Sequence, residues 1–250
     1  MPIFRAPRGT RDLLPPETAT WTRLERLAAD LSARYGYRRI DTPLLEQTDV
    51  FERGVGEVTD IIEKELFRIA PRTEDGEAWA LRPEPTAGIV RAYVQHGMQT
   101  WPQPVKLTET GPMFRYDRPQ AGRYRQFHQV GAEAIGSDNA AIDAELVQLV
   151  ADAFARLGFA GIDVRLNSLG ASRSRGPYRK VLLDAIAELG SRIDPESMAR
   201  FQVNPMRIFD SKEYGDALKR ELPVISAHLS AEDGDHFARV KELLLSLIHI

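Results

Sequence analysis

The sequence contains no cysteine, which excludes disulfide bonds, thiolate metal sites and cysteine nucleophiles. Its net charge is only −3 at pH 7, so a basic tail that binds nucleic acid without structure is not expected. The longest apolar run, LLLSLIHI, is too short to span a bilayer. The first residues, MPIFRAPRGTRDLLPPE, lack the apolar segment of a signal peptide. We therefore expect a cytoplasmic protein without a membrane partner.

The composition is that of a globular protein, with 43% hydrophobic and 28% charged residues among 250. This length suits one large domain or two modest ones. Helical spacing of apolar residues predicts helices at 17–35, 86–95 and 141–157. Strand patterns follow at 37–41, 64–69, 78–82, 105–116, 125–135 and 162–167. From Ala171 only helices are predicted, at 178–190, 213–222 and 231–247. The order indicates an α+β core followed by a smaller helical module.

The stretch GRYRQFHQVGAEAIG, residues 122–136, combines cations, a ring, amides and a carboxylate. Strand alternation gives one face a shared set of side chains: Arg125, Phe127, Gln129, Gly131 and Glu133. A hairpin would add a matching set from the preceding strand: Glu109, Gly111, Met113 and Arg115. We expect Gly131 to leave a gap where a ligand approaches the backbone. His128 falls on the opposite, more apolar face, which indicates a core histidine.

This face has the chemistry for a ligand that carries anionic, aromatic and cationic groups. Arginine binds phosphate and carboxylate oxygens, and a ring offers a stacking platform for a base. Glu133 and Gln129 could accept an ammonium or an imidazole N–H. Arg118 and Arg123 in the connecting loop favour a phosphate-rich partner. The alternative is an amphipathic hairpin whose polar face is merely solvated.

The segment FRYDRPQAGRYRQFHQVGAE resembles motif 2 of class II aminoacyl-tRNA synthetases, in the form found in the histidyl-tRNA synthetase family. PRGTRDLLPPE is similar to that family's N-terminal signature, and GYRRIDTPLLEQTDVFERGVGEVTDIIEKELFRI to its motif 1. LRPEPTAG resembles the loop that holds the amino group of histidine. NSLG and NPMRIFDSK are similar to segments at the start of, and within, a helical insertion. The resemblance covers residues 5–245 and implies a class II synthetase-like antiparallel sheet, flanked by helices, with a helical insertion module.

The resemblance also implies an activity, which is the ATP-dependent ligation of L-histidine to tRNA(His) through histidyl-adenylate. ATP would enter as a substrate with Mg²⁺, and no metal ligand is assigned in the protein. Arg115 is implied to be catalytic. The residues implied to bind ATP are Arg115, Arg123 and Phe127. Those implied to bind histidine are Glu84, Thr86, Gln129 and Glu133. The implied contacts to the tRNA acceptor end are Arg118 and Gln120.

The resemblance further implies a domain organisation. Residues 1–170 would form the catalytic core with motifs 1 and 2, and motif 1 would form a homodimer interface. Residues 171–247 would form the helical insertion domain. Motif 3 and the anticodon-binding domain have no counterpart, and 248–250 are interpreted as a non-native end. We therefore expect an inactive fragment of the catalytic domain.

Two other function classes remain open on the sequence. One is the regulatory histidine-binding subunit of ATP phosphoribosyltransferase, which needs neither the arginine-rich loop of motif 2 nor the NPMRIFDSK insertion. The other is a synthetase-like module that senses uncharged tRNA. For single residues, bland interpretations also stand: Glu84 as a surface acid, Thr86 as a helix cap, and Gln129 as a partner for a neighbouring strand.

Pro85 departs from the family pattern, which usually has glycine at this position. Proline fixes its own φ and favours an extended conformation at the preceding residue. If the loop needs a positive φ there, the histidine site would be distorted. If it does not, the loop would only be stiffer.

Overall fold

The computed structural model describes residues 4–54, 65–71, 73 and 76–247, and the chain divides into two compact units, residues 1–160 and 161–250. The central part of motif 1, residues 55–64, and the final residues 248–250 lie outside the described residues. What the sequence predicts for them therefore stays a prediction. The functional domain boundary at residue 170 also stays a prediction.

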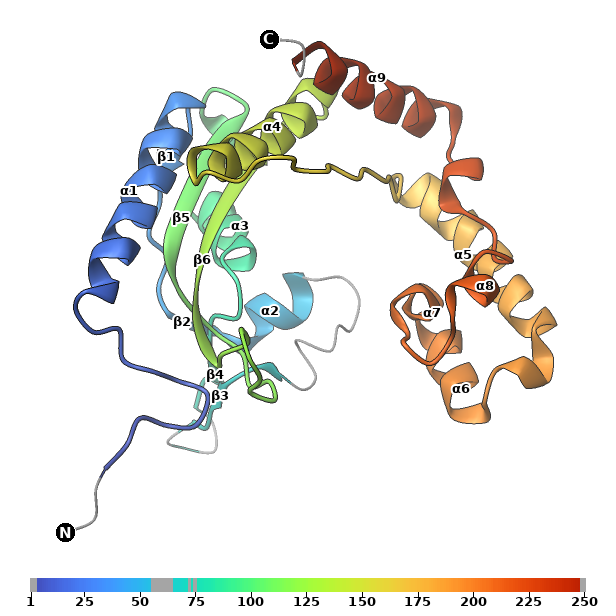
Figure 1. The fold of residues 1–250 in the computed structure, drawn as a ribbon, viewed down its shortest axis with the longest axis horizontal. Helices are drawn as coiled ribbons and strands as arrows, with labels where there is room; N and C mark the ends of the chain where they lie inside the picture. Colours follow the sequence, from blue (N-terminus) through green and yellow to red (C-terminus); the bar gives the residue numbers. More distant parts are fainter. Residues whose placement is uncertain (1–3, 55–64, 72, 74–75, 248–250) are drawn as a thin grey trace. The chain divides into compact units, whose positions relative to one another are not determined.

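Unit 1 is built on two small sheets among the described residues (Figure 1). The first has the spatial order β1 (Arg38–Arg39), β5 (Val105–Phe114) and β6 (Gln126–Ile135). β5 and β6 form an antiparallel hairpin, and β1 runs parallel to β5. The second sheet is antiparallel, with the order β2 (Leu45–Gln47), β4 (Trp79–Leu81) and β3 (Arg68–Ile69). The two predicted hairpins, at 64–82 and 105–135, thus have pairing strands, although β3 and β4 are shorter than predicted.

Helices cover both faces of the β5–β6 hairpin (Figure 1). The described helices of unit 1 are α1 (Glu17–Arg34), α2 (Thr48–Gly54), α3 (Thr86–Gln95) and α4 (Ala140–Arg156). α1 lies against one face, where the Trp21 ring is 4.7 Å from the His128 ring. α3 approaches the other face. Local signals explain the element ends: Asn139 caps α4 by accepting the Ala141 N–H at 2.9 Å, and Gly36 turns the chain after α1 with a φ of 80°.

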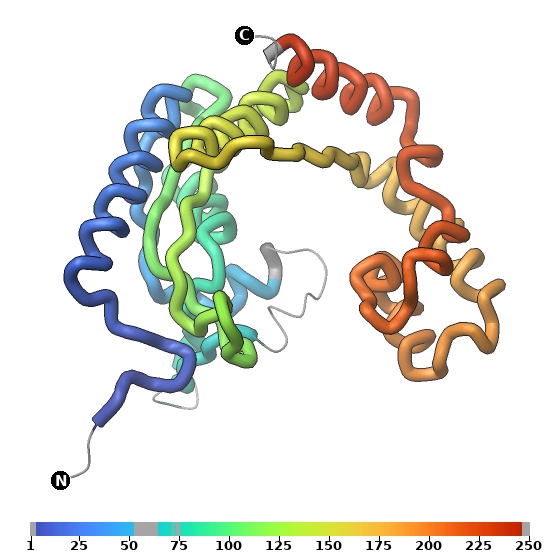
Figure 2. Tube along the Cα trace, in the orientation of Figure 1, coloured from blue at the N-terminus to red at the C-terminus, as the bar shows by residue number. Residues whose placement is uncertain are grey.

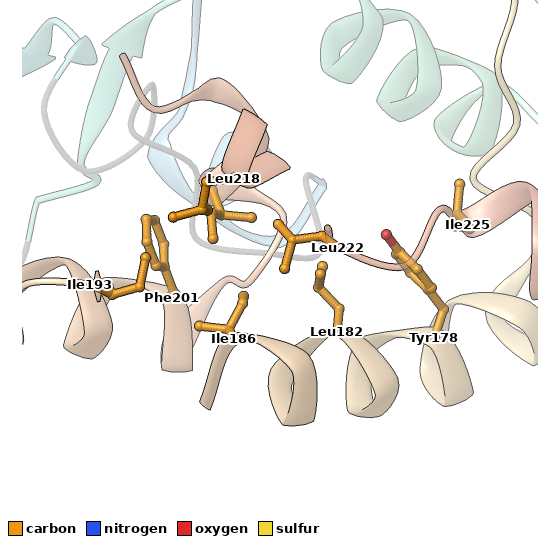
Figure 3. Close-up of a cluster of buried hydrophobic side chains, with 9 residues drawn as sticks. Tyr178, Leu182, Ile186, Ile193, Phe201, Leu218, Leu222 and Ile225 are labelled. Carbon is orange, nitrogen blue, oxygen red and sulfur yellow. The ribbon is translucent and has the colours of Figure 1, made fainter. Parts of the chain in front are cut away.

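Unit 2 holds helices and no strand among its described residues. The helices are α5 (Ser172–Glu188), α6 (Pro195–Val203), α7 (Arg207–Asp210), α8 (Asp216–Lys219) and α9 (Ala231–Leu247). Figure 3 shows the apolar core of this unit, where Tyr178, Leu182 and Ile186 of α5 meet Leu218 and Leu222. The buried side chains of α5 recur at steps of four, which is the spacing of one helix face.

The sequence placed some elements of unit 2 wrongly. Residues 162–167 form no strand: they belong to an extended run between α4 and α5, shown in yellow in Figure 2, with no ladder partner among the described residues. α5 begins at Ser172 and not at 178, since the burial of its face outweighs the low helix propensity of Gly176 and Pro177. The helix expected at 213–222 is only α8, because Leu218 and Leu222 reach the core without a continuous helix.

α6 was not predicted, although its start has two clear signals. Asp194 accepts the Ser197 N–H at 2.9 Å, and Pro195 occupies the first helical position. Both residue types are common at those positions, because the first N–H groups of a helix lack partners within the helix.

Candidate functional site

The polar face of the β5–β6 hairpin has the register that alternation predicted. Met113 lies opposite Phe127, Gly111 opposite Gln129, and Glu109 opposite Gly131. Residues directly opposite in an antiparallel pair share a face. Phe127, Gln129 and Glu133 therefore lie along one surface, at every second position of β6 with Gly131 between the last two. The prediction that His128 faces away from the polar face is also confirmed, since its half-buried ring packs on α1.

The gap expected at Gly131 is closed. A Cβ at Gly131 would lie 2.6 Å from Cγ of Pro85, so the proline ring fills the space that a side chain would take. A ligand cannot approach the backbone there while the ring is present. Pro85 itself is buried and has a φ of −85°. This φ is the one that the proline ring itself imposes, so both alternatives for Pro85 stay predictions.

Glu84 and Thr86 hold the start of α3 in a way that the sequence did not predict. The N-cap residue is Pro85, which has no side-chain acceptor, and the carboxylate of Glu84 before it accepts the N–H of Thr86 at 2.7 Å and that of Ala87 at 2.9 Å. The interpretation of Thr86 as the cap is wrong, because Thr86 is the first residue of the helix. Its hydroxyl is instead free to donate to Glu133 Oε1 at 2.7 Å. Glu84, Thr86 and Glu133 are thereby brought together from a loop, a helix and a strand.

Glu133 is the carboxylate whose protonation the site changes. Burial raises its pKa, and the nearby charge of Glu84 acts in the same direction, while the hydrogen bond from Thr86 opposes them. An N–H donor or a cation placed beside Glu133 would stabilise its ionised form. The position is therefore electrostatically suited to a ligand that carries such a group.

Arg115 lies at the end of the hairpin beside the predicted base platform. Its guanidinium carbon is 5.1 Å from the centre of the Phe127 ring, and its Nε donates to the carbonyl of Pro83 at 3.0 Å. The second contact ties Arg115 to the loop that carries Glu84. A cation, a ring and the Glu84–Thr86–Glu133 group thus share one side of the sheet.

The loop between the strands, residues 116–124, carries the other predicted cations at the surface. Arg123 is paired with Asp117, with 2.8 Å between Nη1 and Oδ2, and it forms an isolated backbone bridge with Gln120. The same carboxylate accepts the N–H of Arg118 at 2.6 Å. Arg118, Gln120 and Arg123 are exposed. The structure brings these three residues together on one loop, and no contact links them to Glu84 or Glu133 in the described residues.

A buried ion pair beneath the site was missed by the sequence reasoning. Arg82 and Glu109 contact each other, with 4% and 1% of their side chains exposed. Thr42 completes the cluster: its N–H donates to Glu109 Oε1 at 2.9 Å, and its carbonyl accepts from Arg82 Nη1 at 2.9 Å. Gly111 is required here, because a Cβ would lie 2.6 Å from Arg82 Nη2. An acid in the middle of a strand, two residues before a glycine, was the available signal.

Comparisons with known proteins place this geometry in a family. The family described as histidyl-tRNA synthetase matches residues 9–174, which is more than half of the chain. The chain belongs to the histidyl-tRNA synthetase family. The histidine–tRNA ligase of Thermosynechococcus vestitus is 44% identical over 98% of this chain, and that of Desulforudis audaxviator is 46% identical over 97%. In both cases the chain spans 57% of the relative's own length.

Solved structures agree with the family. The crystal structure of apo S. aureus histidyl-tRNA synthetase has a TM-score of 0.75 and 32% identity, with 98% of this chain and 55% of that chain covered. A Bacillus halodurans structure, titled as an ATP phosphoribosyltransferase regulatory subunit/histidyl-tRNA synthetase, has a TM-score of 0.67 at 22% identity and so shows the fold alone. The predicted α+β class II synthetase fold is confirmed, and the curated relatives of this family are named as ligases.

The described residues lack two further features, a membrane-spanning helix and a cluster of metal-binding side chains. No described helix is both long enough and apolar enough to cross a membrane. Over the same described ranges, no group of three or more histidine, aspartate or glutamate side chains is arranged to hold a metal ion.

Proposed function

We propose that the whole protein to which this chain belongs charges tRNA(His) with L-histidine, using ATP with its Mg²⁺ as the second substrate. The observation that carries the proposal is the common surface of Arg115, Phe127 and the Glu84–Thr86–Glu133 group. One end suits a nucleotide and the other suits an amino acid with N–H groups. A carboxylate of the amino acid would then lie between them, near Arg115.

Histidine recognition would depend on Glu133 and the residues around it. The imidazole N–H would donate to Glu133, and the ammonium group would lie among Glu84, Thr86 and Gln129. The raised pKa of Glu133 supports this assignment, because a donor that restores the ionised form gains binding energy there. An amino acid without an imidazole would leave a half-buried carboxylate unpaired, which disfavours it.

The first chemical step needs positioning and charge stabilisation more than a general base. A carboxylate oxygen of histidine would form a bond to the α-phosphorus of ATP, and the bond to the bridging oxygen would break as pyrophosphate leaves. Arg115 would hold the α-phosphate and the carboxylate and would offset the charge that develops between them. Phe127 would stack under adenine, and Arg123 would contact the outer phosphates after leaving Asp117.

The second step would transfer histidine to the tRNA. The hydroxyl oxygen of the terminal adenosine would form a bond to the carbonyl carbon of the mixed anhydride, and the bond from that carbon to the phosphate oxygen would break. AMP would leave, and the hydroxyl proton would pass to solvent. Arg118 and Gln120 lie on the exposed loop 116–124 and would meet the acceptor end there. The motif 1 region would form a homodimer interface, residues 171–247 would act as an insertion domain, and the protein would work in the cytoplasm.

The test is the histidine-dependent exchange of pyrophosphate into ATP by the whole protein, together with calorimetric binding of L-histidine and MgATP to this chain. Removing one donor that stabilises the charge of a transition state lowers the rate of an enzyme about a hundred- to a thousandfold. We therefore expect the exchange rate of Arg115→Ala to fall by at least about a hundredfold. Arg165→Ala is the matched control, since this exposed arginine pairs with Asp163 on the run between α4 and α5. Undiminished exchange in Arg115→Ala would contradict the role of Arg115. Histidine binding without MgATP binding would favour a regulatory subunit.

A further inference from the structure

The N-terminal segment lies against loop 116–124, where Arg11 stacks over the Tyr124 ring, and against the base of the loop, where it meets Arg125. The Arg125 N–H donates to the carbonyl of Gly9 at 2.7 Å. Gly9 has a φ of 87°, and a Cβ on it would lie 2.8 Å from Cγ of Arg125. Glycine is needed on both counts, since other residues avoid this φ and would meet the arginine stem. In Figure 1 the dark blue N-terminal segment turns beside this end of the hairpin.

The side chain of Arg125 holds the opposite side of the same loop. Its guanidinium carbon lies 4.0 Å from the centre of the Tyr116 ring, and its Nε donates to the carbonyl of Asp117 at 3.2 Å. Its own carbonyl accepts the N–H of Arg115 at 2.9 Å. One residue therefore contacts both ends of the loop and the N-terminal segment. We call this set of contacts the Arg125 clasp.

Tyr116 links the clasp to a third segment of the chain. The Tyr116 N–H donates to the carbonyl of Glu65 at 2.6 Å, and the ring meets the Phe67 ring edge-on at 5.2 Å. The loop is thus fixed at its base, while its cations, Arg118 and Arg123, remain at the surface. Fixed ends reduce the conformations that the loop must lose when its cations bind a ligand.

We propose that Arg125 is a positioning residue that holds the arginine-bearing loop 116–124 in place for the outer phosphates of ATP. The inference rests on the proposed function, because it takes Arg123 as the phosphate contact. It differs from that function in assigning a role to Arg125 and Gly9, which touch no substrate. The adenosine part of ATP would be bound by Phe127 on β6 and would not depend on the clasp.

Arginine is the residue type that the clasp requires. A planar guanidinium can stack on the Tyr116 ring while its Nε–H donates in the plane to Asp117. A lysine could keep the charge near the ring but would not make both contacts. We therefore expect Arg125→Lys to restore only part of what Arg125→Met loses.

The experiment compares three variants of this chain with the unchanged chain: Arg125→Met, Arg125→Lys and, as control, Lys241→Met. The control removes a cation that lies 4.8 Å from a ring, that of Phe237, in α9. Hydrogen exchange is followed in peptides from 7–11 and 116–124. Dissociation constants are measured for MgATP and for adenosine. In Arg125→Met we expect faster exchange in both peptides and MgATP binding weakened about tenfold, which is about 1.4 kcal/mol.

The ratio of the two dissociation constants separates positioning from general damage. We expect adenosine binding to change by less than about twofold in Arg125→Met, because the contacts that it removes are with Tyr116 and Asp117 at the loop base and leave β6 intact. Equal losses for MgATP and adenosine would overturn the positioning role, as would unchanged exchange in 116–124. If the unchanged chain binds no MgATP, the proposed function fails for this chain, and the exchange data alone decide whether the clasp holds the loop.

Discussion

Two polar clusters at the same hairpin differ in almost every physical respect. The cluster of Arg82, Glu109 and Thr42 is buried under the loop that carries Glu84, and its charged groups have several hydrogen-bond partners. The pair of Asp117 and Arg123 lies on the exposed loop 116–124, where 60% of the Arg123 side chain is accessible. Buried charges are costly to separate and fix a structure, whereas exposed pairs exchange partners at little cost. The difference indicates a rigid region around the proposed amino acid site, beside a loop whose arginine is held only by an exposed pair.

The largest effect is expected from breaking the buried cluster with Glu109→Gln. The guanidinium of Arg82 would then keep its charge without a counter-charge, which costs about 3–5 kcal/mol in the free energy of unfolding. Denaturation followed by tryptophan fluorescence measures this, because Trp21, Trp79 and Trp101 all lie in unit 1.

The matched control for Glu109→Gln is Asp41→Asn, which removes one partner of an exposed pair, that with Arg39, in the same unit. A loss below about 1 kcal/mol in Glu109→Gln would contradict the contrast between the two clusters. The double variant Arg82→Met with Glu109→Leu should recover much of the loss, since replacing both charges leaves none unpaired.

A smaller loss is expected where the loop of Glu84 packs on the sheet, in Gly131→Ala. The added methyl would meet Cγ of Pro85 at 2.6 Å, and overpacking of this kind costs about 1–3 kcal/mol. Adding Pro85→Ala removes that atom and leaves Cβ at 3.5 Å, an ordinary contact. The double variant should therefore be more stable than Gly131→Ala alone. If the two losses simply add, the ring and the glycine are not coupled.

The hairpin could be predicted from the sequence, whereas the Arg82–Glu109 pair and the contact of Pro85 with Gly131 could not. The hairpin, its register and the shared face of Phe127, Gln129 and Glu133 follow from a period of two, which depends only on local geometry. The buried pair cannot be predicted from a local period, because Arg82 and Glu109 are 27 residues apart in the sequence and are brought together by the topology of the fold. The closed gap at Gly131 has the same cause, because Pro85 reaches it from another segment.

The start of α3 shows a second reason why the sequence alone was insufficient: two residues could accept its first N–H groups. Glu84 and Thr86 are both residues that can accept N–H groups at a helix start, and the sequence favoured threonine on general preference. The structure selects Glu84, since its carboxylate reaches two N–H groups while Thr86 turns to Glu133. The choice depends on a partner 47 residues away, which no local pattern contains.

The free energy of unfolding is expected to depend on pH through Glu133, because burial destabilises the ionised form of this carboxylate in the proposed amino acid site. Its pKa is raised in the folded state, so the folded state binds the proton more tightly than the unfolded one. Stability of the ligand-free chain should then fall as pH rises from the ordinary glutamate value of about 4.3 through the raised value. Glu133→Gln should remove this part of the slope and be at least as stable at pH 7.

The quantity to measure for Glu133 is the difference in unfolding free energy between the two chains as a function of pH, since other carboxylates titrate in both. The stability of Glu133→Gln relative to the unchanged chain should increase as pH rises. A relative stability that instead decreases would contradict the raised pKa of Glu133. L-Histidine binding at pH 7 should be weaker in Glu133→Gln, because a neutral amide replaces the carboxylate opposite the imidazole N–H.

The smallest effect on stability is expected at the exposed pair, in Asp117→Asn. The amide oxygen can still accept the Arg118 N–H, now made at 2.6 Å by Oδ1, so the change removes little besides charge. Exposed ion pairs contribute about 0–1 kcal/mol, and the free energy of unfolding of unit 1 should change by no more than that. MgATP binding should not weaken, because Arg123 loses a competing partner and keeps its own charge. A loss of stability as large as that of Glu109→Gln would mean that the loop is held by its surface charges, and the contrast between a rigid site and a responsive loop would then be wrong.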